Sequence, residues 1–100
     1  MNHFTYTTQE KDYGLSYETI ETLHIETIGY LTVINSNNST EVKYSGNDPA
    51  SNAGALMESI LFINNAKRNS KTLKITSTVQ SAGVTTIKGT INIKRFMWGA

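Results

Sequence analysis

The chain has 100 residues, the length of one domain, with no cysteine and a formal net charge of +1. This length excludes two separately folded domains, and the lack of cysteine excludes a disulfide framework and a thiolate nucleophile. Fourteen threonines and ten isoleucines favour strands, because β-branched side chains fit a pleated sheet surface.

The sequence shows no sign of export or membrane insertion. Its first eight residues lack the basic and apolar regions of a secretory signal. The longest unbroken apolar run, Ile60–Ile63, is far too short to span a bilayer. Together with the absence of cysteine, these features predict a cytoplasmic protein that has no membrane partner.

The first half of the chain predicts strands. Alternation of aromatic and threonine residues predicts a short strand from Phe4 to Thr8, within a segment, residues 1–15, that we otherwise expect to be mobile. Residues 16–27 fit either a helix or a strand by periodicity, and their threonine and isoleucine content favours a strand. Residues 30–34 predict a buried strand, which forms a hairpin with a strand over residues 40–45.

One amphipathic helix is predicted over about residues 50–68. Asp48 can cap its first turn, and Pro49 suits the first helical position because proline has no N–H to leave unpaired. We expect Glu58, Ser59 and Asn65 on its solvent side. Apolar residues at three- and four-residue spacing give the opposite face: Ala53, Leu56, Met57, Ile60, Leu61 and Ile63.

Residues 72–95 predict a C-terminal hairpin. Inward residues of the two strands meet when paired residue numbers sum to 164, so that Leu73 faces Ile91 and Ile75 faces Gly89. This register leaves a three-residue loop, Ser81–Gly83, with glycine where a left-handed residue is needed. Gly89 leaves a dent in the sheet that a neighbouring group can fill.

These elements define one α+β domain over residues 1–100. It has an antiparallel sheet of four to six strands in the order β-β-β-β-α-β-β, with the single helix packed on one face. Residues 95–100 form a tail that is available for contacts.

The sequence offers little for catalysis. His24 and Glu26 share one face of a strand, but the only other histidine is His3, and a catalytic metal site needs about three protein ligands. Glu18 and Glu21 form a possible carboxylate pair without a recognisable partner. No phosphate-binding loop, nucleophile elbow or zinc motif is present. We therefore expect no enzyme, no cofactor and no metal.

Charge is divided unevenly along the chain. Residues 1–47 hold two lysines against six acidic residues, a net −4, and residues 48–100 hold seven basic against two acidic residues, a net +5. Pairing of the two halves within one sheet explains this division more simply than a charged partner does. The alternative is a nucleic-acid-binding or acidic-partner face on the C-terminal hairpin: Lys67, Arg68, Lys71, Lys74, Lys88 and Lys94. A pI near 8.0 and the lack of interleaved aromatics argue against it.

The C-terminal tail is unusually rich in residues that favour protein interfaces. Arg95, Phe96, Met97 and Trp98 follow one another there. Two readings stay equally open: the tail forms a partner or dimer interface, or it folds back and its aromatic residues cover the core.

The sequence thus predicts a small non-enzymatic interaction protein that binds and occludes a partner protein and forms a homodimer. The inhibitor, immunity and adaptor proteins of phages and other mobile elements are of this general type.

Overall fold

In the computed structural model, the described residues are 2–46, 49–65 and 71–92. Four strands come first, β1 (Asn2–Asp12), β2 (Tyr17–Ile25), β3 (Gly29–Ser36) and β4 (Thr40–Gly46). The helix α1 (Pro49–Asn65) follows, and β5 (Leu73–Ser81) and β6 (Val84–Ile91) complete the sheet. The α+β class and the predicted order of elements are confirmed.

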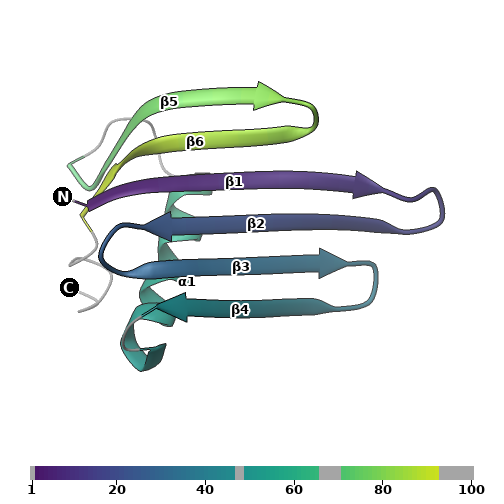
Figure 1. Ribbon diagram of the computed structural model, residues 1–100, viewed down its shortest axis with the longest axis horizontal. Helices are drawn as coiled ribbons and strands as arrows, with labels where there is room; N and C mark the ends of the chain where they lie inside the picture. The colour runs from purple at the N-terminus through teal and green to yellow at the C-terminus, as the bar shows by residue number, and fades with distance from the viewer. Residues whose placement is uncertain (1, 47–48, 66–70, 93–100) are drawn as a thin grey trace.

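The six strands form one antiparallel sheet in the spatial order β4-β3-β2-β1-β6-β5 (Figure 1). The first four strands are consecutive hairpin neighbours, because the turns between them are too short for any other pairing. Helix α1 then carries the chain back across the sheet, so that β6 pairs with the free side of β1. The N-terminal strand therefore lies inside the sheet and joins the acidic and basic halves of the chain.

Two uncertain segments are now defined. Residues 17–25 form β2, so the strand interpretation of the ambiguous segment is confirmed. The N-terminal strand is longer than the predicted Phe4–Thr8, and residues 2–12 of the segment that we expected to be mobile form β1. Because β1 pairs with β2 on one side and β6 on the other, its backbone is held along most of its length.

The core lies between α1 and the face of the sheet that α1 covers, which we call the inner face. Its strand residues are Phe4, Tyr6, Leu23, Ile25, Leu31, Val33, Leu73 and Ile91, and its helix residues are Ala55, Leu56, Ile60 and Ile63. Burying these side chains supplies most of the stabilisation, at roughly 25 cal/mol per Å² of apolar surface removed from water. The predicted dent at Gly89 is occupied by the Lys74 carbonyl group, which an added Cβ would overlap, and by the edge of the Phe4 ring, 3.0 Å from the position of that Cβ.

The helix differs from its prediction in two respects. It begins at Pro49 as expected and is described to Asn65, and residues 66–68 lie outside the described part. Its buried face is rotated from the predicted stripe: Met57 and Leu61 are exposed, whereas Ser59 is fully buried. The Ser59 hydroxyl donates to the Ala55 carbonyl at 2.7 Å, which satisfies this polar group within the core.

The predicted register of the C-terminal hairpin is correct only near its base. Leu73 faces Ile91 and Ile75 faces Gly89, but a β-bulge between Ile75 and Ser77 shifts every later pair by one residue. The bulge takes up the residue that the prediction placed in the loop, so the turn has two residues instead of three. Ala82 and Gly83 both have positive φ, 52° and 78°, as in the tight turn that matches strand twist.

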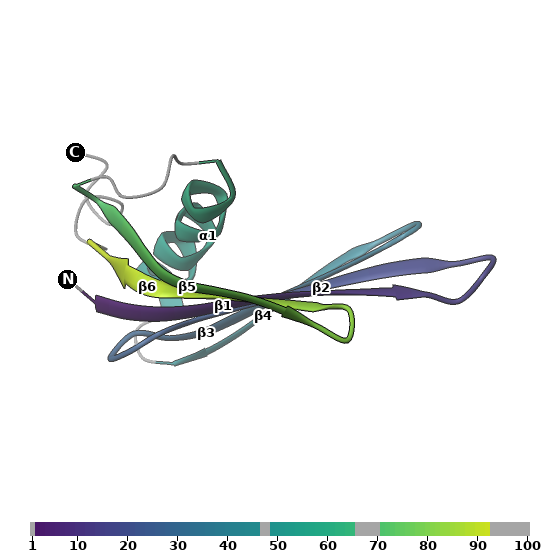
Figure 2. The same cartoon turned by 90° about the horizontal axis from the view of Figure 1, so that it is seen from above.

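Because of the bulge, Val79 lies on the outer face of the sheet, where it is 55% exposed, and not on the inner face, where the register without a bulge would place it. The helix covers only one end of the inner face, because its 17 residues span about 25 Å and run across the strands. The β1–β2, β3–β4 and β5–β6 hairpin turns all extend away from the helix (Figures 1 and 2). The inner face is thus left open at the end of the sheet that carries these turns.

Candidate functional site: the uncovered end of the inner face

The open end of the inner face is acidic. Strand alternation places Glu10, Asp12 and Glu21 on this face, beyond the residues that α1 covers. The four lysines of the described strands lie on the opposite, outer face: Lys11, Lys43, Lys74 and Lys88. The charge asymmetry therefore runs between the two faces of the sheet as well as between the halves of the chain.

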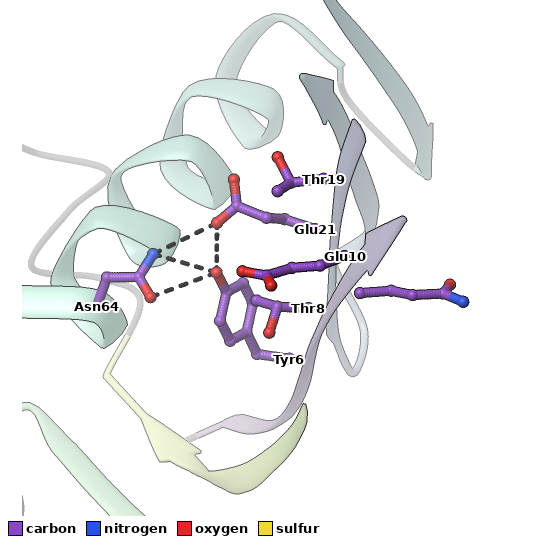
Figure 3. A pocket seen from close by; sticks show the side chains of 7 residues that line it. Tyr6, Thr8, Glu10, Thr19, Glu21 and Asn64 are labelled. Carbon is purple, nitrogen blue, oxygen red and sulfur yellow. Dashed lines mark hydrogen bonds between the residues drawn. The ribbon is translucent and has the colours of Figure 1, made fainter. Parts of the chain in front are cut away.

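A hydrogen-bonded cluster marks the boundary between the core and the open surface (Figure 3). The Tyr6 hydroxyl donates to the Glu21 carboxylate, and the Asn64 amide nitrogen donates to the Tyr6 oxygen at 3.1 Å. Burial and the bond to Glu21 raise the pKa of Tyr6 well above its ordinary value. The phenol therefore stays protonated and fixes the Glu21 carboxylate as an acceptor at the end of α1.

Two shallow hollows extend from this cluster toward the hairpin turns. The first has a volume of about 310 Å³ and is lined by side chains that include Glu10, Glu21 and Asn64. The second, of about 360 Å³, is lined by residues that include Asp12 and Tyr17. Because both hollows share Thr8 and Glu10, they form one groove. We call the groove the distal inner surface, defined by Thr8, Glu10, Asp12, Tyr17, Thr19, Glu21, Gln80 and Thr85.

Exposed apolar side chains are concentrated where this surface ends. Tyr13, Leu15 and Tyr17 are 61%, 101% and 44% exposed, and we call these three residues the β1–β2 tip. Partial desolvation, then a hydrogen bond to Glu10 and the negative charges of Glu10 and Asp12, raise the pKa of Tyr17, so its hydroxyl stays a neutral donor beside the carboxylates. A large apolar side chain that makes no contact within its own fold is a common anchor for a partner protein.

The β1–β2 tip is held in place by hydrogen bonds. The Asp12 carboxylate accepts the Gly14 N–H at 2.9 Å, and the Tyr13 N–H donates to the Ser16 carbonyl at 2.9 Å. Asn37, from the neighbouring β3–β4 turn, accepts the Tyr17 N–H at 3.1 Å and donates to the Leu15 carbonyl at 3.4 Å. These bonds order the tip before any partner arrives, which lowers the entropic cost of binding.

The suggested carboxylate pair does not form. Glu18 and Glu21 are three residues apart on β2, so alternation places them on opposite faces of the sheet. Glu21 belongs to the distal inner surface, whereas Glu18 lies on the outer face opposite Lys11.

His24 and Glu26 do not form an acid–base pair in the structure either. The His24 ring stacks on Tyr30 with ring centres 4.1 Å apart, and Glu26 accepts the backbone N–H of His3 at 3.4 Å. Among the described residues, no three histidine or acidic side chains are grouped so as to hold a metal ion.

The residues of the proposed basic face are only partly described. Lys74 and Lys88 are exposed on the outer face, and Lys71 is exposed just before β5. Lys67, Arg68 and Lys94 lie outside the described residues. The proposed interface residues of the tail, Arg95, Phe96, Met97 and Trp98, also lie outside them, so neither reading of the tail is decided.

Sequence reasoning missed the distal inner surface. To predict this surface, one must know that the part of the inner face covered by the helix ends at Tyr6 and Asn64. The length of the helix alone does not give that position. One signal was available: Tyr13, Leu15 and Tyr17 surround Gly14 in a turn, where apolar residues have no structural reason to occur.

No protein-family model matches the chain, and no curated protein or solved structure is significantly similar to it. Within the described residues, no helix combines the length and the apolar character that crossing a membrane requires.

Proposed function

We propose that this protein is a small non-enzymatic interaction protein that binds a partner protein through the β1–β2 tip and the distal inner surface, and so occludes the partner's surface. The observation that carries the proposal is the exposure of Leu15, which is complete although the backbone around it is hydrogen-bonded. An ordered turn that presents apolar side chains to water is well suited to insert into a pocket.

The acidic residues of the distal inner surface indicate which partner surfaces are complementary to it. Glu10, Asp12 and Glu21 lie along the groove, and the lysines of the described strands are all on the other face. The complementary surface presents lysine or arginine side chains around an apolar pocket that receives the tip. Such complementarity speeds encounter and selects among partners, while the buried apolar anchor supplies most of the affinity.

The test is differential capture by the full-length chain. Tagged wild-type protein and a Leu15→Ala variant are exposed to extract of the source cells, and proteins retained by the first but not the second are identified by mass spectrometry. The purified candidate is then titrated calorimetrically. We expect Leu15→Ala to weaken binding by about tenfold or more, as for a central apolar anchor.

Val79→Ala is the matched control, because Val79 is also an exposed apolar residue but lies on the outer face, on β5. It should leave the affinity unchanged. Glu10→Gln should weaken binding more at low than at high salt, since screening already removes part of the attraction at high salt. A partner that binds Leu15→Ala as tightly as wild type would contradict the proposal.

A second candidate is nucleic-acid binding on the outer face. It is favoured by the His24–Tyr30 stack, which lies on the same face as Lys88 and adds the aromatic surface that the hairpin lacks. Binding of a fluorescent single-stranded oligonucleotide should then fall with salt and with Lys88→Ala or Tyr30→Ala. No binding at low salt would rule this candidate out.

A further inference from the structure

The two edges of the sheet are not equivalent. Strand β5 forms one edge and carries the β-bulge between Ile75 and Ser77, a device that twists an edge and discourages pairing with another chain. Strand β4 forms the other edge, pairs with β3 without any register shift and contains no proline. Within the described residues, no strand pairs with its far side.

The backbone direction of β4 follows from its turn. The Ser36 N–H donates to the Ser39 carbonyl at 2.9 Å, so Ser36 and Ser39 form a hydrogen-bonded pair. Along an antiparallel ladder, hydrogen-bonded pairs alternate with pairs that are not hydrogen-bonded. Glu41 and Lys43 therefore direct their backbone groups toward β3. Val42 between them directs its N–H and C=O outward, toward the open edge, and its side chain is 50% exposed.

Charges on β4 distinguish the ways in which two copies of this edge can pair. Antiparallel pairing centred on Val42 places Glu41 opposite Lys43 of the second copy, and does so twice by symmetry. Centring on Glu41 instead brings two glutamates together, and centring on Lys43 brings two lysines together. Like charges directly opposite each other destabilise a pair of strands, so the first of these three registers is favoured, and it alone pairs opposite charges.

We propose that two copies of this chain pair through β4, centred on Val42, to form a continuous twelve-stranded antiparallel sheet. In each copy Glu41 already contacts Lys43 at 3.3 Å, so the dimer joins four alternating charges at its centre. A network of this kind stabilises more than an isolated surface pair does. The two-fold axis leaves no β4 edge open, so assembly stops at two copies.

Helix α1 is compatible with this arrangement. In Figure 1 its first turn lies at the Gly46 end of β4 and extends past the open edge there, whereas the Thr40 end is uncovered. The two-fold axis passes near Val42, so it brings the uncovered end of each strand beside the helix-bearing end of the other. This inference is independent of the proposed partner-binding function, because the β1–β2 tip lies on different strands.

The experiment measures the mass of the full-length chain by light scattering over a range of concentrations. We expect a dimer whose dissociation constant rises about tenfold or more in Val42→Pro, because proline removes the central outward N–H but no bond to β3. Lys43→Glu should weaken the dimer through repulsion from Glu41 of the second copy. Glu41→Lys with Lys43→Glu should restore it, because the charges then alternate again.

Lys74→Glu is the matched control: it makes the same charge change on the outer face, but at the other edge of the sheet. It should leave the dimer intact. A monomer at every concentration would overturn the proposal, as would a dimer that none of the β4 changes weakens. An effect of Lys74→Glu equal to that of Lys43→Glu would also overturn it, because net charge alone would then explain the result. Circular dichroism confirms that each variant is folded.

Discussion

At the scale of single residues, the Tyr6 hydroxyl joins the core to the open surface. It is almost fully buried, donates to Glu21 and is bonded to Asn64. We expect Tyr6→Phe to lower the free energy of unfolding by about 1–3 kcal/mol, because a hydrogen bond to a charged group is lost and Glu21 keeps fewer partners. Urea unfolding measures the change, and Tyr17→Phe, at an exposed tyrosine, should have a much smaller effect.

The raised pKa of Tyr6 gives this same variant a pH signature. In the unfolded chain the phenol loses its proton near its ordinary pKa of about 10, but the folded state retains it to higher pH. The folded state thus binds more protons above pH 10, so stability falls as pH rises there. The stability difference between wild type and Tyr6→Phe should be constant below pH 9 and narrow above pH 10. A difference that stays constant through pH 11 would contradict this assignment.

At the scale of elements, local signals in the sequence determined most of the fold. Pro49 correctly marked the start of the helix, and the β-branched residues of 17–25 correctly favoured a strand. The bulge after Ile75 was not predictable in this way, because Thr76 and its neighbours are all ordinary strand residues. The Thr76 hydroxyl donates to the Lys88 carbonyl at 3.1 Å, a cross-strand contact with no local sequence signature.

The face that the helix buries was likewise not predictable from local sequence. Six apolar positions fit a stripe that includes Met57 and Leu61, and periodicity alone cannot choose between this stripe and one rotated by a residue. The sheet decides, because Ala55 and the small Ser59 permit close approach of the helix to the strands. Periodicity therefore identified the element correctly but not the side chains that it buries.

The candidate site was even less accessible to sequence reasoning. Glu10 and Glu21 are eleven residues apart in the chain and come together only through the β1–β2 register, which pairs Thr8 with Glu21 and Glu10 with Thr19. Counting charge by halves of the chain did detect an asymmetry. It could not reveal that Glu10, Asp12 and Glu21 face one side of the sheet and the lysines of the described strands the other, since that depends on where each strand begins to alternate.

At the scale of the whole molecule, the two proposals together specify the geometry of a complex. A two-fold axis perpendicular to the sheet places both inner faces on the same side of the twelve-stranded dimer. Both β1–β2 tips are then available to partners that approach from one direction. A partner that is itself dimeric would be bound at two points, and such linkage raises overall affinity without new contacts.

This geometry predicts that dimer formation and partner binding can be removed separately. With a purified monomeric partner, wild type should form a complex of two chains and two partners, whereas Val42→Pro should form a one-to-one complex of unchanged calorimetric affinity per chain. Leu15→Ala should remain dimeric but bind the partner about tenfold or more weakly, because β4 and the β1–β2 tip share no residue. If Val42→Pro weakened binding of a monomeric partner as much as Leu15→Ala does, the edge and the tip would form a single interface, and the two-surface arrangement would be wrong.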